Sequence, residues 1–81
     1  MLMNIETLEA AALFREDGLN NYKISLRSKG KIEVLAVAES IGGGGHVHAA
    51  GASVVENYQT IKDQVVKELL RLLNDVRMTG S

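Results

Sequence analysis

Four consecutive glycines, Gly42–Gly45, followed at once by His46, are the residues of this chain that point most clearly to chemistry. Glycine loses more backbone freedom on folding than any other residue, so such a run is expected where the backbone takes unusual angles or is closely approached. A glycine loop that opens a helix presents unpaired N–H groups at the positive end of the helix dipole, which suits phosphate. We therefore predict a phosphate-binding loop, in which the amides of Gly43, Gly44 and Gly45 contact phosphate oxygens and the His46 ring donates a further hydrogen bond.

A second group of residues that favours anion binding lies at the end of a predicted strand. Arg27, Ser28 and Lys29 are adjacent, and residues 23–31 include four cations and no acid. Because the chain as a whole carries a net charge of −1, this clustering concentrates positive potential at one place. A strand with a solvated polar face is the more ordinary explanation, and the sharper hypothesis is a polar rim that contacts an anion.

Familiar ligand sites built on glycine or histidine fit this stretch poorly. A P-loop ends in Gly-Lys followed by Ser or Thr, and a dinucleotide fingerprint places its glycines directly after a strand. His46 and His48 would point in nearly opposite directions on a helix, and no carboxylate lies between Glu39 and Glu56 in sequence, so a metal site is disfavoured. A histidine with no nucleophile and no orienting acid is insufficient for catalysis. Binding remains, with His48 in a structural or solvent-facing role.

The competing interpretation of this stretch is a flexible surface loop that carries two incidental histidines. The small residues Ala49, Ala50 and Gly51 follow directly, which favours a tightly packed backbone that a ligand approaches. We expect residues 46–50 to form one helical turn that ends at Gly51.

The elements that hold these groups are predicted from hydrophobic periodicity. Tyr22, Ile24 and Leu26 alternate with polar residues, which is typical of a half-buried strand. Gly42 occupies the place of a helix C-cap glycine, and Asn57 is a suitable N-cap for a long helix with an apolar stripe. The predicted strands are residues 8–15, 22–28 and 52–55, and the predicted helices are residues 33–41 and 58–77. The fold class is α+β, a small mixed β-sheet packed against two main α-helices, with a glycine-rich loop.

Length and composition limit the classes of function. A chain of 81 residues forms one modest domain. Its near-neutral charge argues against a broad electrostatic nucleic-acid interface, so any contact with nucleic acid should be local. The sequence has no cysteine, in keeping with a reducing compartment, and shows neither a signal peptide nor a membrane-spanning run. We expect a cytoplasmic protein with no membrane partner.

Two motifs together resemble a known family. The segment Gly-Gly-Gly-Gly-His-x-x-Ala-Ala-Gly at residues 42–51, preceded by Ser-Leu-Arg-Ser-Lys-Gly at residues 25–30, is similar to the C-terminal DHH-associated domain (DHHA1 type) of DHH-family phosphoesterases. The branch it resembles most is that of the bifunctional oligoribonucleases that also remove a phosphate from 3′-phosphoadenosine 5′-phosphate. A related glycine-rich module occurs in single-strand exonucleases, cyclic-dinucleotide phosphodiesterases and alanyl-tRNA synthetases.

The resemblance implies a division of labour between two domains. In the family, a larger N-terminal DHH domain carries the Asp and His ligands of two manganese ions and hydrolyses the phosphodiester, while the smaller domain binds the substrate. This chain lacks the Asp-His-His segment, so it is expected to hold no metal of its own and to be inactive alone. By the same resemblance, Arg27, Ser28 and Lys29 would bind substrate phosphates, and Gly42–Gly45 and His46 would contact the nucleotide placed at the metals.

The expected organisation is a lead-in over residues 1–7, the DHH-associated substrate-binding domain over residues 8–77 and a tail over residues 78–81. The expected partners are short RNA or a nucleotide phosphate, and the N-terminal DHH domain of the parent chain. A second copy of this chain is a further option, because a domain separated from its partner exposes apolar surface. The alternatives left open are a stand-alone single-stranded nucleic-acid-binding module and a dimerisation module that uses the 58–77 helix.

Overall fold

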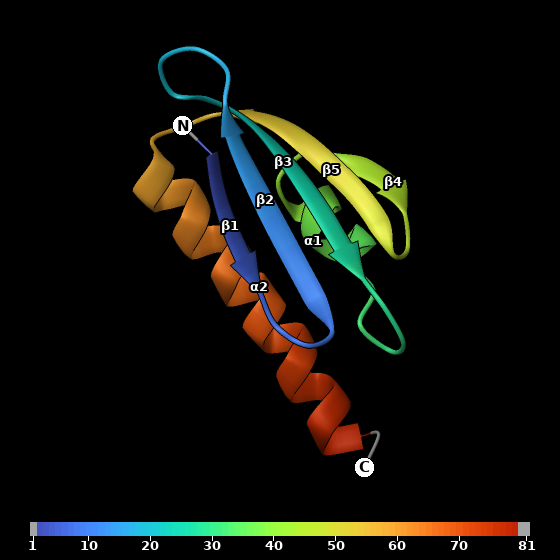
Figure 1. Ribbon diagram of the computed structural model, residues 1–81. Helices are drawn as coiled ribbons and strands as arrows, with labels where there is room; N and C mark the ends of the chain where they lie inside the picture. The colour runs from blue at the N-terminus through green and yellow to red at the C-terminus, as the bar shows by residue number, and fades with distance from the viewer. Residues whose placement is uncertain (1, 80–81) are drawn as a thin grey trace.

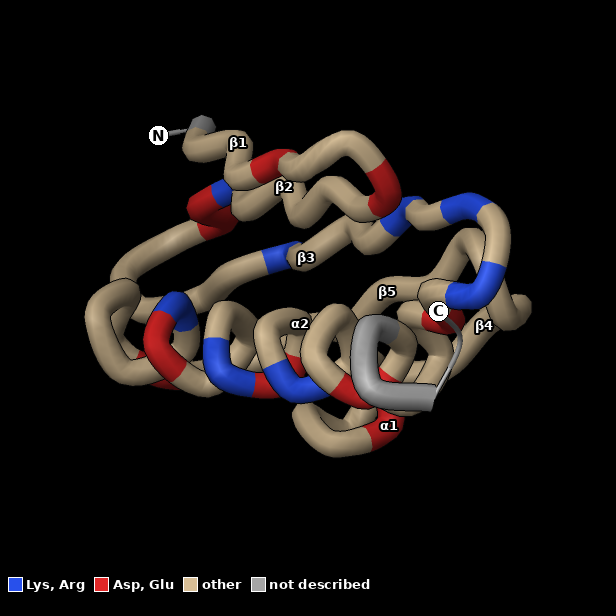
Figure 2. The backbone as a smooth tube through the Cα atoms, turned by 90° about the horizontal axis from the view of Figure 1, so that it is seen from below, with Lys and Arg blue, Asp and Glu red and all other residues tan. Residues whose placement is uncertain are grey.

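The computed structural model describes residues 2–79, with side-chain environments for residues 3–76. The elements along the chain are β1 (Leu2–Glu6), β2 (Ala10–Glu16), β3 (Asn21–Ser28), α1 (Leu35–Ser40), β4 (Gly44–His46), β5 (Ala49–Val55) and α2 (Tyr58–Thr79). The five strands form one sheet in the order β1-β2-β3-β5-β4 (Figure 1). Both helices lie on the same side of that sheet, so the molecule has two layers (Figure 2). The predicted α+β class is confirmed.

The sheet is antiparallel throughout the described chain, so the expectation of a mixed sheet is wrong. The pairs β1–β2, β2–β3, β3–β5 and β4–β5 are all antiparallel. Three of these pairs are joined by short turns, which only antiparallel neighbours allow. The chain travels from β3 through α1 and β4, and the β4–β5 hairpin then turns it back, so that β5 also runs against β3.

Most predicted elements match observed ones, and two segments differ. The lead-in 1–7 includes β1, which pairs along β2; Met1 lies outside the described residues. Residues 46–50 are not a helical turn but the end of β4, a turn and the start of β5. Alanine favours helix in isolation, but here Ala49 and Ala50 pair with β3, and tertiary pairing overrides propensity. Of the expected tail 78–81, α2 includes the first two residues, and residues 80–81 lie outside the described range.

The core lies between the sheet and the helices. Inward-facing side chains of β2 and β3 meet the apolar stripe of α2, and the fully buried examples include Phe14, Leu26 and Val65. The predicted N-cap is confirmed, because the Asn57 side-chain oxygen accepts a hydrogen bond from the Thr60 amide at 2.9 Å. No helix within residues 2–79 is both long and apolar enough to cross a membrane.

An aromatic group closes one end of this core. Phe14 and Tyr58 pack edge to face, with ring centroids 5.6 Å apart, and Tyr22 lies 5.7 Å from Tyr58. Burial of the ring, together with the Glu16 carboxylate 3.5 Å from its hydroxyl, raises the pKa of Tyr22. The phenol therefore stays protonated at neutral pH and donates to Glu16.

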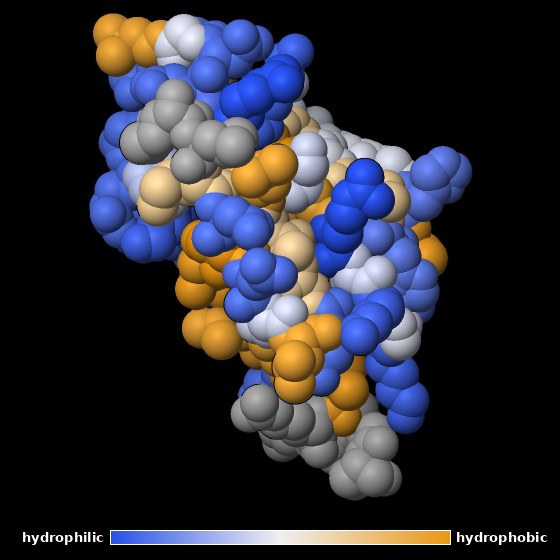
Figure 3. All heavy atoms as spheres, viewed as in Figure 1, coloured by the Kyte–Doolittle hydropathy of each residue, from blue (hydrophilic) through white to orange (hydrophobic). Residues whose placement is uncertain are grey.

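The opposite face of the sheet is not covered by either helix (Figure 2). Because side chains alternate along a strand, burying Tyr22, Ile24 and Leu26 directs Lys23, Ser25 and Arg27 to this open face. In Figure 3 this face shows apolar and weakly polar residues along its middle, between hydrophilic residues. The open face is where the predicted site residues of β3 and β4 can meet.

Replacing leucine by alanine should lower the free energy of unfolding by different amounts at buried and at exposed positions. Leu26→Ala should lower the free energy of unfolding by about 2–5 kcal/mol, because Leu26 is buried in the core. Leu70→Ala, on an exposed part of α2, should change it by less than about 0.5 kcal/mol. Urea denaturation followed by circular dichroism measures both, and equal losses would contradict the assignment of the core.

Candidate functional site

The register of the sheet brings Arg27 and His46 onto one face. Arg27 lies opposite Ala49 in the β3–β5 pair, and His46 lies opposite the same Ala49 in the β4–β5 pair. Residues directly opposite one another project to the same side of a sheet. Two strand spacings separate Arg27 from His46, about 10 Å. The methyl group of Ala49 leaves the space between the two longer side chains open.

A hollow of about 360 Å³ lies on this open face. That volume is within the range of small-molecule sites. Ser25, Leu26 and Arg27 of β3 line one side, and the lining from β4 and β5 consists of small residues, among them Gly44, Ala49 and Gly51. The next row of paired residues, Ser25–Gly51–Gly44, continues the floor without a large side chain. The hollow exists because these positions carry almost no side-chain atoms.

Arg27 is the cation available at this hollow. Within the described residues it pairs with no carboxylate, and its side chain is exposed. Lys23, four residues earlier on the same face, forms an ion pair with Asp17 at 3.6 Å. The predicted run of cations along β3 therefore provides one open guanidinium beside the hollow.

The first two glycines of the run belong to the end of α1. Gly42 has φ +89°, and its amide donates to the Glu39 carbonyl at 3.1 Å, while the Gly43 amide donates to the Ala38 carbonyl at 2.7 Å. This is a Schellman motif, so the predicted C-cap glycine is confirmed. Gly43 also packs so tightly that a Cβ atom there would lie 2.0 Å from the Gly51 carbonyl oxygen. The Gly43 amide is used to cap α1, so it does not fit the expected phosphate cradle.

The last two glycines form β4, and they differ from each other. Gly45 has φ +139°, and a Cβ atom there would lie 2.7 Å from Ala50, so the fold itself requires glycine. At Gly44 a Cβ atom would meet no protein atom within 4 Å, and the backbone is not left-handed. The fold gives no reason for glycine at position 44, and this position lines the hollow. The expected loop that opens a helix is instead a turn after α1 followed by an edge strand.

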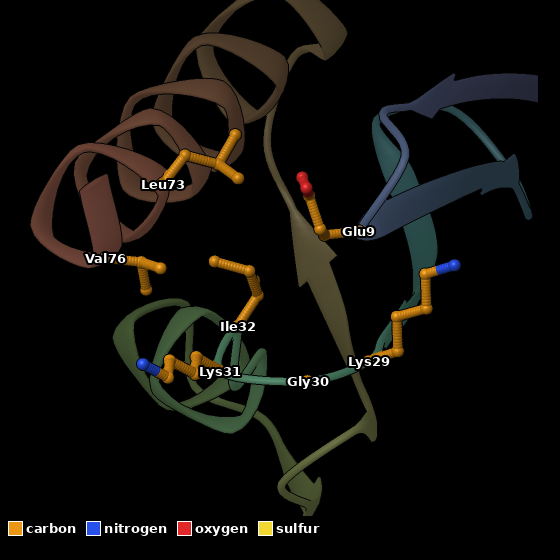
Figure 4. Close-up of a pocket in the computed structure, with 7 residues that line it drawn as sticks. All are labelled: Glu9, Lys29, Gly30, Lys31, Ile32, Leu73 and Val76. Carbon is orange, nitrogen blue, oxygen red and sulfur yellow. The ribbon is translucent and has the colours of Figure 1, made fainter. Parts of the chain in front are cut away.

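Ser28 and Lys29 do not share the hollow with Arg27. Ser28 follows the inward alternation of β3, and its hydroxyl is buried with no hydrogen-bond partner among the described residues. Lys29 follows the strand and lines a separate cavity of about 390 Å³ beside α2, with apolar walls from Ile32, Leu73 and Val76 (Figure 4). In Figure 4 the Lys29 ammonium points away from these apolar side chains. Three consecutive residues of the sequence thus occupy three different surroundings.

His48 has a structural role. Its Nε2 lies 2.8 Å from the Gly30 carbonyl oxygen, and because a carbonyl only accepts, the ring nitrogen donates. The His48 carbonyl in turn accepts a hydrogen bond from the Ser28 amide at 3.0 Å. These bonds fasten the turn between β4 and β5 to the chain that leaves β3, as expected for a structural histidine.

Sequence reasoning did not single out Ser25, Ala49 and Gly51 as lining residues. Ser25 could have been found from the alternation of β3, since it is two residues from Arg27 on the same face. The prediction of a helical turn over residues 46–50 that ends at Gly51 does not place Ala49 and Gly51 opposite β3, where the structure has them.

The arrangement suits binding of an anion. Arg27 lines the hollow, and His46 lies in the same row of paired residues without lining it. The lining includes no carboxylate and no cysteine. Within residues 2–79, no three His, Asp or Glu side chains gather closely enough to hold a metal ion. The hollow can therefore position a ligand that carries phosphate.

Comparisons with known proteins agree with this architecture. The family model described as "DHHA1 domain" matches residues 1–77. A protein of Mycoplasma pneumoniae named bifunctional oligoribonuclease and PAP phosphatase NrnA is 46% identical over 52 residues, which cover 64% of this chain and 16% of that protein. A protein of the same name from Thermus thermophilus is 39% identical over 62 residues, which cover 70% of this chain and 18% of that protein. This chain therefore spans less than a fifth of either relative.

Replacement by alanine should affect the free energy of unfolding differently at a glycine that the fold requires and at one that it does not. Gly43→Ala is expected to lower the free energy of unfolding by about 1–3 kcal/mol, because its Cβ would collide with backbone atoms of β5. Gly44→Ala should leave it unchanged or raise it by up to about 1 kcal/mol, because the added methyl group meets open space. Thermal unfolding of the two variants separates these outcomes, and a comparable loss at Gly44 would mean that the fold itself needs this glycine.

The two histidines allow a second comparison of stability between a residue with a structural hydrogen bond and one without. His48→Ala should lower the free energy of unfolding by about 0.5–1.5 kcal/mol through loss of its hydrogen bond to Gly30. His46→Ala, at an exposed position of β4, should be neutral within about 0.5 kcal/mol. Urea titration measures both values, and the reverse order would refute the structural role of His48.

Proposed function

This chain belongs to the DHHA1 domain family, and we propose that its open-face hollow binds the phosphate and nucleoside of a substrate for a DHH-type phosphoesterase. The proposed substrates are short oligoribonucleotides and 3′-phosphoadenosine 5′-phosphate, since both relatives are named for activity on an oligoribonucleotide and on PAP. Hydrolysis, and the manganese ions that support it, are assigned in this proposal to a catalytic domain outside the chain. The domain alone should bind substrate without cleaving it.

The observation that carries the proposal is the Arg27 guanidinium, which pairs with no carboxylate among the described residues and lines a hollow whose floor consists of small residues. His46 lies on the same face, opposite the same Ala49. A guanidinium binds phosphate oxygens through two parallel hydrogen bonds. A separation of about 10 Å between the two positions exceeds the reach of one phosphate and suits a nucleotide whose phosphate is at Arg27. The nucleoside then lies over Gly44, where a side chain would occupy its place.

This mode of binding differs from a cradle of glycine amides. Because Gly43 caps α1 and Gly45 is required by its backbone, the run is not a row of equivalent N–H donors. In this proposal the Arg27 side chain binds the anion, and Gly44 provides room for the nucleoside. Phosphate contacts by Ser28 and Lys29 are not part of the proposal, since the two residues lie away from the hollow.

The proposed partner is the DHH catalytic domain of the parent protein. The hollow is a depression on an uncovered sheet face (Figure 2), so a substrate lying in it presents its other side to whatever packs there. A catalytic domain facing this sheet would enclose the substrate between the two domains. A cytoplasmic location belongs to the same proposal and fits a chain without cysteine.

Replacing the open guanidinium tests the proposal. Arg27→Ala should weaken binding of 3′-phosphoadenosine 5′-phosphate by about 1–3 kcal/mol, the range for a lost charge-assisted hydrogen bond. Arg71→Ala is the matched control, because Arg71 lies on α2 and pairs with Glu68 there, and its affinity should equal that of the unchanged chain. Isothermal titration calorimetry gives the affinities. Equal affinities for all three proteins would remove Arg27 from the site.

A further inference from the structure

A second hollow adjoins the first on the open face of the sheet. Its volume is about 210 Å³, and it is lined by Asn4, Ala11, Leu13, Ser25 and Arg27. Ser25 and Arg27 line both hollows, so the two depressions meet at β3. A ligand that fills both hollows would therefore pass Ser25 and Arg27.

The second hollow has the chemistry of a surface for a planar ring. The register places Asn4, Leu13 and Ser25 in one row across β1, β2 and β3. Leu13 is 36% exposed, so part of its apolar surface is open to a ligand. Apolar side chains of this kind contact the faces of unstacked bases, and polar groups at the edge form hydrogen bonds with the base.

Asn4 supplies the polar edge. Its amide nitrogen donates to Glu6 at 3.3 Å, and the structure shows no partner for its amide oxygen among the described residues. A carboxamide has two donor hydrogens and an acceptor oxygen, so one N–H and the oxygen stay available. An amide with this donor–acceptor pair can bind the edge of a nucleobase.

We infer that the second hollow is the subsite for the base of an adjoining nucleotide. This inference rests on the proposed function. Arg27, the unpaired cation shared by the two hollows, binds the phosphodiester that joins the two nucleosides. One nucleoside lies over Gly44, and the base of the other lies against Leu13 with its edge at Asn4. The open face therefore has room for a dinucleotide and should bind it more tightly than a single nucleotide.

Two ligands of equal charge test this inference by calorimetry on the whole chain. One is the dinucleoside monophosphate ApA, and the other is the methyl ester of adenosine 5′-monophosphate, which keeps the phosphodiester but has no second base. ApA should bind about tenfold more tightly. Leu13→Ala and Asn4→Ala should each lower the ApA affinity by about three- to tenfold, the scale of a lost apolar contact or hydrogen bond, and leave the methyl ester within about twofold.

Control variants distinguish a failure of the base subsite from a failure of the proposed function. Leu13→Met keeps an apolar surface and should retain ApA binding, and Leu70→Ala on exposed α2 should change neither ligand. Gly44→Val, which fills the first hollow, should weaken both ligands. If both ligands bind equally and Leu13→Ala has no effect while Gly44→Val weakens both, the subsite is refuted and the proposed function stands. If neither ligand binds, or Gly44→Val changes nothing, the proposed function itself fails.

Discussion

The candidate site depends on the pairing register of three strands. Arg27 and His46 share a face because each lies opposite Ala49, and a slip of one residue in either pair would turn one of them to the other side of the sheet. The buried alternation of Tyr22, Ile24 and Leu26 fixes β3. The tight packing of Gly43 on β5 and the hydrogen bond between His48 and Gly30 fix β4. The residues that set this register line the core and the turns, while Arg27 and His46, the proposed ligand contacts, are exposed.

Small side chains have two separate uses in this chain. Gly42, Gly43 and Gly45 are required by a helix cap, a close backbone contact and a left-handed φ angle, respectively. Gly44 meets no such demand, and Gly44 and Ala49 both line the hollow on the open face. A motif that looks uniform in sequence therefore contains glycines that the fold requires and one that it does not, and our proposal assigns the latter to the binding surface. The effect of substituting one glycine on stability or binding therefore does not predict the effect of substituting its neighbour.

Sequence reasoning succeeded where a pattern is local. The alternation in β3, the C-cap at Gly42 and the N-cap at Asn57 all depend on a few neighbouring residues, and the structure confirms each. It failed at β4 and at the start of β5, because a three-residue strand of two glycines and a histidine has no hydrophobic period and is defined by its partner. The structure separates Arg27, Ser28 and Lys29, which the sequence analysis had placed in one site. The alternation of β3 already predicts this for Arg27 and Ser28, because successive strand residues face opposite sides of the sheet. The place of His46 opposite Arg27 could not be derived without the pairing.

The central claim is that the hollow over Gly44 is the ligand site, and not the cavity beside Lys29 and α2. The most direct measurement is an amide chemical-shift titration of the chain with 3′-phosphoadenosine 5′-phosphate. The account predicts that the largest changes occur at Arg27, Gly44, His46 and Gly51, with little change at Ile32, Leu73 and Val76, which line the other cavity. The largest changes at Ile32, Leu73 and Val76, with none along β4 and β5, would contradict it.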